Sequence, residues 1–155
     1  MNYWLLKSEP DAYSYFDLES APNKRTLWDG VRNFQARNLL RDQLKSGDLA
    51  FFYHSSCKEP AVVGVCRITE AGITDPTSLD PTSDYYDPKS TAEKPRWITV
   101  EVEAVTKLNR PVTLKELKQY PQLEDMVLLN RSRLSVQPVS EQQWQFIQKL
   151  AEQGG

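Results

Sequence analysis

Asp48-Leu49-Ala50-Phe51-Phe52-Tyr53-His54 is the stretch of this 155-residue chain that decides the fold class. It is nearly continuously apolar and is bounded by a glycine and by two serines, which is the pattern of a strand buried on both faces. Two further segments, 61–69 and 97–107, are rich in β-branched residues and predict strands as well. The second alternates apolar and polar residues. The domain is therefore expected to be built around a sheet.

Shorter elements surround these strands. We expect strands at 3–7 and 133–139, and helices over 14–19, over 33–45, from Thr113 to before Pro121, and after Ser140. Gly47 stands where a left-handed cap of the 33–45 helix would fit. Strands and helices do not alternate regularly, as a parallel sheet would require. We therefore expect an α+β fold, a mixed β-barrel with short helices, in a single domain spanning residues 1–155.

The composition limits the cellular setting and the metal chemistry. No apolar run approaches the roughly 20 residues that span a bilayer, and the N-terminus lacks the basic start of a signal peptide. We expect a cytoplasmic monomer without a membrane partner. Cys57 and Cys66 are too few for a disulfide framework, and His54 is the only histidine, so no metal site and no cofactor are expected.

Charge is distributed unevenly along a chain whose net charge is −2. Residues 70–103 hold eight acidic groups against three basic ones, whereas residues 107–133 hold six basic groups against three acidic ones. The second segment permits a basic face, although on charge alone ordinary solvated surface is the favoured interpretation of both segments. A domain with a pI near 5.5 gains little non-specific attraction to phosphate, so its affinity for plain duplex should be poor and salt-sensitive.

Residues 73–96 form a polar, proline-rich segment that is too long for an ordinary connection in a compact domain. Such loops are usually either functional or disordered. The Tyr85-Tyr86 pair favours order, because paired aromatic rings on a disordered tether would gain nothing from burial.

Signatures of common catalytic sites are absent from the sequence: there is no nucleophile elbow, phosphate loop, dinucleotide fingerprint or zincin motif. A dyad of His54 and Cys57 is conceivable, but residues three apart at a strand end need not face each other. A binding module is therefore favoured over an enzyme. The enzyme alternative would use His54 and Glu9 as acid and base on a nucleotide or base.

Aromatic and polar side chains gather beside the turns, at 28–33, 53–56, 85–87 and 96–97. Such a mixture holds planar ligands, because the ring supplies a stacking face while polar groups read the edge of a base. Glu9, in the turn Ser8-Glu9-Pro10, could accept from an exocyclic amine.

Most of these side chains have a structural alternative. Trp97, like other tryptophans within strand or helix patterns, fits a core position, and Trp28 fits a core and a ligand contact equally. A histidine at a strand end, such as His54, often serves as a structural hydrogen-bonding group. Arg32 and Arg37 could hold a nucleic-acid backbone or solvate a helix.

Five segments in order resemble the EVE domain family, which includes the thymocyte nuclear protein 1 group and its bacterial relatives. The segments are Tyr3-Trp4-Leu5-Leu6-Lys7-Ser8-Glu9-Pro10, Trp28-Asp29-Gly30-Val31-Arg32-Asn33-Phe34-Gln35-Ala36-Arg37-Asn38, Phe52-Tyr53-His54-Ser55-Ser56-Cys57, Tyr85-Tyr86-Asp87-Pro88-Lys89 and Arg133-Leu134-Ser135-Val136. The resemblance implies a PUA-like barrel, related to PUA, ASCH and YTH domains, and a reader of modified bases in DNA or RNA.

The same resemblance implies where the ligand lies. It places around a modified cytosine or adenine the side chains of Ser8, Glu9, Trp28, Asn33, Tyr53, His54, Ser55 and Trp97, with Tyr85 and Tyr86 on a covering loop. Arg32 and Arg37 are the expected contacts to the nucleic-acid backbone. A module for small molecules or proteins that uses the same cleft is a further alternative.

Overall fold

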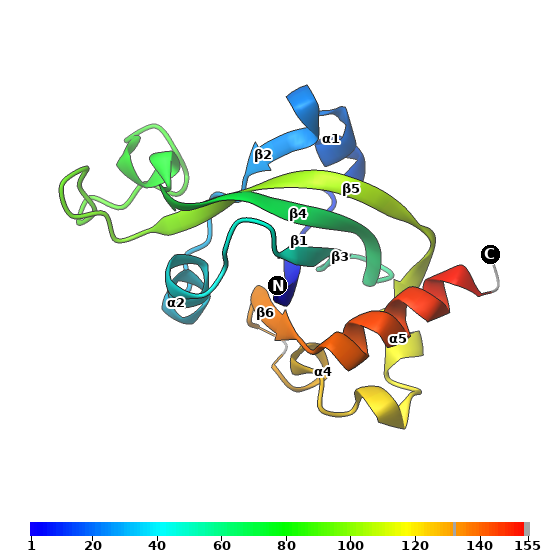
Figure 1. Ribbon diagram of the computed structural model, residues 1–155. Helices are drawn as coiled ribbons and strands as arrows, with labels where there is room; N and C mark the ends of the chain where they lie inside the picture. Colours follow the sequence, from blue (N-terminus) through cyan, green and yellow to red (C-terminus); the bar gives the residue numbers. More distant parts are fainter. Residues whose placement is uncertain (132, 154–155) are drawn as a thin grey trace.

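One mixed sheet forms the centre of the computed structural model, which describes residues 1–131 and 133–153 (Figure 1). Within these residues the sheet has six strands in the order β2-β5-β4-β3-β1-β6. Their bounds are β1 Tyr3–Ser8, β2 Arg25–Leu27, β3 Leu49–His54, β4 Ala61–Thr74, β5 Ile98–Thr113 and β6 Val136–Val139. β1 and β3 pair in parallel, and the other pairs are antiparallel. With helices around this mixed sheet, the predicted α+β class is confirmed.

The sheet is curved but open. β4 and β5 pair along most of their length, with several shifts of register of the kind that β-bulges produce. Bulges bend and twist a pair of strands. The described edge strands, β2 and β6, are nevertheless not paired with each other. The predicted barrel is therefore not confirmed, because the curvature does not bring the two edges together.

The helices that the sequence predicts begin at the expected caps, whereas α4 was not predicted and has no side-chain cap. Their bounds are α1 Tyr15–Ser20, α2 Phe34–Asp42, α3 Leu114–Leu117, α4 Val127–Asn130 and α5 Glu141–Glu152, with 3-10 turns at Pro22–Lys24, Pro76–Leu79 and Pro121–Leu123. Ser14 and Ser140 each form a reciprocal capping box. Thr113 caps α3, but the Glu116 carboxylate binds Arg110 and does not return to the cap. The 113–116 segment is thus half of a capping box.

The C-terminal end predicted for the 33–45 helix is wrong. α2 ends at Asp42, and the N–H of Lys45 donates to the buried carboxylate of Asp48 at 3.1 Å, which draws the chain out of the helix. Gly47 does have a positive φ of 96°, but it lies in the following turn, where its N–H donates to the Ile68 carbonyl at 2.8 Å. It lies in the turn before β3 and does not cap α2.

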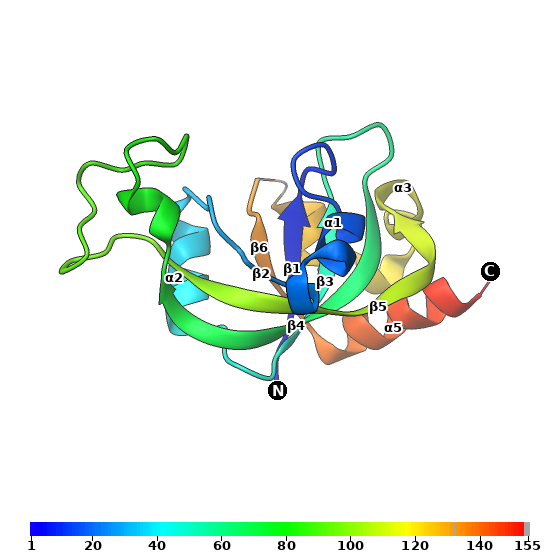
Figure 2. The same cartoon turned by 90° about the horizontal axis from the view of Figure 1, so that it is seen from above.

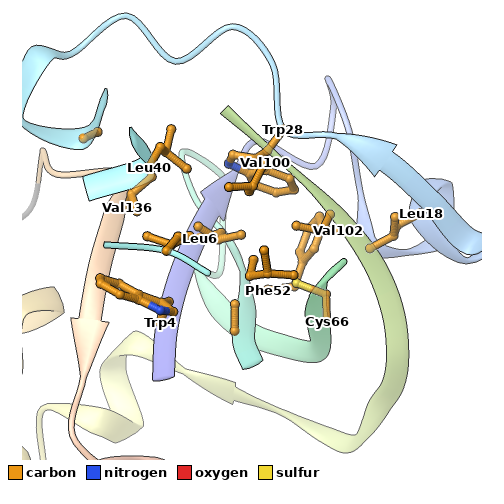
Figure 3. Close-up of a cluster of buried hydrophobic side chains, with 14 of the residues drawn as sticks. Trp4, Leu6, Leu18, Trp28, Leu40, Phe52, Cys66, Val100, Val102 and Val136 are labelled. Atoms are coloured by element: carbon orange, nitrogen blue, oxygen red, sulfur yellow. The ribbon is translucent and has the colours of Figure 1, made fainter. Parts of the chain in front are cut away.

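Both faces of the central strands are buried, which explains the continuous apolar run of β3. Leu6 and Phe52 point into one core, which α1 and α2 cover, and Figure 3 shows them beside Trp28 and Val100. Leu5 and Phe51, one residue earlier in each strand, belong to a second core. Figures 1 and 2 show α5 on that second side of the sheet. Alternate side chains therefore serve two separate cores.

Close packing holds α1 against the sheet. A Cβ atom at Gly64 of β4 would lie 2.5 Å from the ring of Tyr15, so only glycine lets this ring approach the strand. The Tyr15 hydroxyl donates to the Val65 carbonyl at 2.8 Å, and its backbone N–H donates to Nε2 of His54 at 3.1 Å. These contacts fix the turn between β1 and α1, which carries Glu9.

The segment between β4 and β5 lies at the same end of the sheet as α2 in both Figure 1 and Figure 2. β4 runs five residues beyond the predicted strand, to Thr74, and hydrogen bonds organise the following segment. The predicted order of this loop is confirmed by those bonds. No helix among the described residues is long and apolar enough to cross a membrane.

Candidate functional site

Five of the predicted residues meet in one cavity, which lies beside the C-terminal end of β1. We call it the Tyr85 cavity; its volume is about 550 Å³, and it is lined by residues 7–9, 12–13, 26–32, Tyr85 and Ser135. The predicted members are Ser8, Glu9, Trp28, Arg32 and Tyr85. Three separate segments, the β1–α1 turn, the 26–32 stretch and the loop between β4 and β5, therefore converge here.

A second cavity adjoins the first. This Ser55 cavity has a volume of about 540 Å³ and takes in the predicted residues Tyr53 and Ser55. It shares Lys7, Glu9 and Ser135 with the Tyr85 cavity. Glu9 thus stands at the junction of two hollows.

Tyr53 is almost fully buried in the wall of the Ser55 cavity, at 2% exposure. Burial, and then the neighbouring Cys57, raise the pKa of its phenol to about 12. The hydroxyl therefore stays protonated at neutral pH and can act as a hydrogen-bond donor or acceptor.

Glu9 and Tyr85 give the Tyr85 cavity its chemistry. Within residues 1–131 and 133–153, the exposed carboxylate of Glu9 has no hydrogen-bond partner, so its oxygens can accept from a ligand. The ring of Tyr85 is 46% exposed and packs on Gly30, where a Cβ atom would lie 2.9 Å from it. An acceptor and a half-exposed aromatic face therefore border the same space.

Trp28 contributes to the cavity from the core. Its side chain is 7% exposed, and its ring meets the ring of Phe52 edge to face at 5.3 Å (Figure 3). The sequence left open a core role and a ligand-contact role for Trp28. Most of the side-chain surface is buried in the core, and only a small part faces the cavity.

Trp97 and Asn33, two predicted ligand contacts, do not line either cavity. The indole of Trp97 is 5% exposed, donates to Asp87 at 2.8 Å and stacks on Phe34 at 4.8 Å. The side-chain oxygen of Asn33 caps α2 by accepting from Ala36 at 2.9 Å. Both side chains stabilise local structure.

His54 and Tyr86 also lie outside the lining of the two cavities. Nε2 of His54 accepts from the Tyr15 backbone, so this imidazole is neutral, and burial lowers its pKa. The thiol of Cys57 lies 3.8 Å from the His54 carbonyl and contacts the backbone, not the ring. These contacts match the structural alternative for His54. Tyr86 is exposed at 41% on the covering loop.

Arg32 and Arg37, the expected backbone contacts, make internal hydrogen bonds. The guanidinium of Arg32 donates to Asp75 at 3.1 Å and to the Tyr85 carbonyl at 2.6 Å. Arg37 donates to the Arg96 carbonyl at 2.5 Å. Arg32 therefore links the 26–32 stretch to the covering loop and holds Tyr85 beside the cavity.

Asp75 is the centre of this link. The residue is 1% exposed. Its carboxylate accepts hydrogen bonds from the Gly30 N–H at 2.9 Å, from Arg32, and from both the N–H and the hydroxyl of Thr77. Burial alone would raise the pKa of Asp75, but the donors from Thr77, Gly30 and Arg32 together lower it. The charged form is therefore the stable one.

Residues that the sequence did not single out also line the Tyr85 cavity. They are Lys7, Tyr13, Thr26, Asp29 and Ser135. Partial loss of hydration, and then the nearby Asp75, raise the pKa of Asp29, while burial lowers the pKa of Lys7. Lys7, Asp29 and Ser135 lie inside three of the quoted segments, so proximity to Ser8, Trp28 and Arg133 was a usable signal. Thr26 lies outside those segments and reads as an ordinary strand residue.

A cavity of similar size, about 560 Å³, lies where the chain begins, but its aromatic residues are engaged. Tyr3 stacks on Trp144 at 4.6 Å, and the indole N–H of Trp4 donates to Asp48 at 3.0 Å. Among the described residues no group of three or more His, Cys, Asp or Glu could hold a metal ion. The Tyr85 cavity is therefore the better candidate for a ligand site.

A mixed open sheet, helices on both faces and an aromatic and polar cavity at the end of β1 define an α+β domain of a recognisable kind. The chain belongs to the EVE domain family, whose sequence profile matches residues 2–150.

Human thymocyte nuclear protein 1 is 40% identical over 168 aligned residues, which cover 97% of this chain and 74% of the human protein. The structure of human THYN1 in complex with DNA containing 5-methylcytosine covers 100% of both chains with a TM-score of 0.95 and 39% identity. A YTH domain of Zygosaccharomyces rouxii MRB1 has a TM-score of 0.55 at 18% identity, covering 99% of this chain and 86% of that domain. This last likeness concerns the fold alone.

The substitution Asp75→Asn tests whether the carboxylate holds the covering loop. The new side-chain amide would turn an N–H₂ group toward the donors of Gly30 or Arg32, so we expect a loss of about 2–4 kcal/mol in the free energy of unfolding. Amide hydrogen exchange in residues 76–97 should accelerate. Asp80→Asn is the matched control, because the exposed Asp80 also accepts from a Thr two residues later and its amide oxygen can keep those bonds. Equal exchange in both variants would contradict the role of Asp75.

The neutral His54 predicts a pH dependence of stability. Burial lowers the pKa of His54 in the folded state, whereas an unfolded histidine has a pKa of about 6.5. As the pH falls through this range, the unfolded chain therefore binds more protons than the folded one. The free energy of unfolding should therefore fall as the pH is lowered from about 7.5 to about 5.5. Urea titrations at several pH values measure this fall. It should shrink in His54→Gln, which does not titrate there; an unchanged slope in that variant would contradict the prediction.

Proposed function

We propose that this protein is a binding module that recognises a modified base in nucleic acid, with 5-methylcytosine in DNA as the ligand to be tested first. The base leaves its stack and enters the Tyr85 cavity, as in proteins that read or modify single bases. The observation that carries the proposal is the meeting of the Glu9 carboxylate and the Tyr85 ring at one cavity of about 550 Å³. That volume lies within the range of small-ligand sites.

The chemistry of cytosine suits these two groups. Its exocyclic N4 amine donates hydrogen bonds, which the carboxylate of Glu or Asp can accept, whereas thymine presents an acceptor oxygen at the same position. Glu9 can therefore distinguish cytosine from thymine, although 5-methylcytosine and thymine carry the same methyl group. The small exposed part of Trp28 in the cavity wall offers a contact surface for that methyl group, and burial of the methyl group from water favours the methylated base.

Tyr85 takes the stacking role that the sequence assigned to Trp28 or Trp97. A stacked base gains roughly 1–3 kcal/mol from an aromatic ring, provided that the face of the ring is accessible. As whole residues, Tyr85 is 46% exposed, whereas Trp28 and Trp97 are 7% and 5% exposed. The Tyr85 ring packs on Gly30, and the Arg32 guanidinium lies 5.6 Å from its centre. Stacking on Tyr85 is therefore the arrangement that requires no opening of the core.

The relative with the DNA complex supports the choice of ligand. Human THYN1 was crystallised with DNA containing 5-methylcytosine, and its fold matches this chain along the whole length of both. Three further predicted contacts share a cavity with Glu9: Ser8 lines the Tyr85 cavity, and Tyr53 and Ser55 line the Ser55 cavity. Adenine derivatives and RNA are the other ligands to compare.

The test uses matched oligonucleotides that carry cytosine, 5-methylcytosine or thymine at one position, with affinity measured by fluorescence anisotropy. The wild type should prefer 5-methylcytosine to both others. Glu9→Ala should lower the preference over thymine about tenfold, the value of one lost base contact, and should leave the preference over unmethylated cytosine. Glu124→Ala is the control, because Glu124 is equally exposed and lines none of the cavities described above.

Two results would count against the proposal. Equal affinity of the wild type for all three oligonucleotides would exclude a reader of 5-methylcytosine. Free nucleosides that bind as tightly as oligonucleotides would point to a small-molecule site. A similar loss of affinity for all three oligonucleotides in Tyr85→Ala, with the fold unchanged by circular dichroism, would support stacking on this ring.

A further inference from the structure

Arg131 and Arg133 differ from most of the other arginines in forming no ion pair within the described residues. The chain has nine arginines, and six of them form ion pairs with Asp or Glu. In the described part of the chain Arg131, Arg133 and Arg37 form none. Arg37 is partly occupied, since it donates to a backbone carbonyl and its guanidinium lies 4.9 Å from the ring centre of Phe34. Arg131 and Arg133 are exposed, and Arg131 donates at 2.7 Å to the neutral amide of Gln35.

Both arginines border a hollow without an acidic residue in its lining. This Asn130 cavity, of about 300 Å³, is lined by Asn33, Gln35, Asn130, Arg131, Arg133 and Leu134. A positive site without a neutralising carboxylate is complementary to phosphate, and the guanidinium group binds phosphate oxygens in pairs. The charge of this spot is opposite to that of the whole chain, which is −2.

The hollow lies close to the base site. Arg133 lines the Asn130 cavity and the Ser55 cavity, and the Ser55 cavity shares Lys7, Glu9 and Ser135 with the Tyr85 cavity. The two arginines therefore lie near a strand whose base enters beside Glu9.

The backbone that carries these arginines is anchored. The buried side-chain amide of Gln137 donates to the carbonyls of Leu134 at 2.7 Å and of Arg131 at 3.3 Å. The N–H of Lys7 donates to the Ser135 carbonyl at 2.9 Å, which ties the segment to β1. Anchoring the carbonyls of Arg131, Leu134 and Ser135 holds the segment beside the base site.

We infer that Arg131 and Arg133 bind the phosphate backbone of the strand whose base enters the Tyr85 cavity, an inference that rests on the proposed function. This assigns the backbone contact to residues other than Arg32 and Arg37, because Arg32 already donates to Asp75, Thr77, Val31 and the Tyr85 carbonyl. The basic 107–133 segment thus contributes its last two arginines to an interface, and its lysines remain solvated surface.

Salt dependence of binding separates a backbone contact from a base contact. Each phosphate that a cation neutralises contributes about 0.9 to the slope of log K against log salt for duplex DNA. In the double variant Arg131→Gln/Arg133→Gln the slope should fall by about two. Affinity should fall about tenfold at low salt, by the same factor for methylated and unmethylated duplexes, because phosphates carry no base identity.

Two controls make the result specific. Lys107→Gln/Lys118→Gln removes the same charge from exposed positions that line none of the described cavities, and it should keep the wild-type slope. Arg131→Lys/Arg133→Lys keeps both charges and should restore most of the slope.

The outcomes distinguish this inference from the proposed function. If the wild type is selective for 5-methylcytosine and the arginine double variant keeps the wild-type slope, the inference fails alone. If the double variant loses the slope but the wild type is not selective, the proposed function fails and the backbone contact stands. A wild type that binds no DNA overturns both.

Discussion

The buried carboxylate of Asp75 is the interaction on which the candidate site depends. It accepts hydrogen bonds from Gly30 and Arg32 on one side and from Thr77 on the other, so it joins the stretch before α2 to the loop between β4 and β5. A charge that is nearly inaccessible to solvent is stable only with several donors, and here those donors belong to two distant segments. Forming the ion pair therefore requires the loop to lie against Gly30. Tyr85 reaches the cavity because Arg32, held by Asp75, also binds its carbonyl.

The sheet supplies the other wall. β1 and β3 are neighbouring parallel strands, so both end on the same side of the sheet, and the Ser55 N–H donates to the Ser8 carbonyl at 2.9 Å. The turn after β1 is held by α1, whose position depends on the contact of Tyr15 with Gly64. The backbone of Glu9 is thereby held beside the cavity that Tyr85 also lines. A rigid strand end and a hydrogen-bonded loop together form a preorganised cavity, which lowers the entropic cost of binding a planar ligand.

Much of this arrangement could be predicted from the sequence, because strands and caps have local signals. The apolar run of β3 and the capping residues Ser14 and Ser140 depend on neighbours along the chain. Long-range contacts have no such signal. Trp97 was predicted as a ligand contact, but its indole binds Asp87 and stacks on Phe34. Arg32 was predicted as a contact to the nucleic-acid backbone, but its guanidinium pairs with Asp75, which is far away in the sequence. The end of α2 was mispredicted for the same reason, since Asp48 acts from a later turn. The predicted cytoplasmic location, single domain and monomeric state stay predictions.

We propose that one base enters the cavity that Glu9 and Tyr85 line while the backbone runs toward Arg133. The decisive experiment is a crystal structure of the protein with a duplex that carries one 5-methylcytosine. The base should lie outside the helical stack, with its N4 amine within hydrogen-bond distance of the Glu9 carboxylate and its ring against Tyr85, and phosphates should lie at Arg131 and Arg133. A base that stays stacked in the duplex, or that occupies the cavity at the start of the chain, would overturn the proposal.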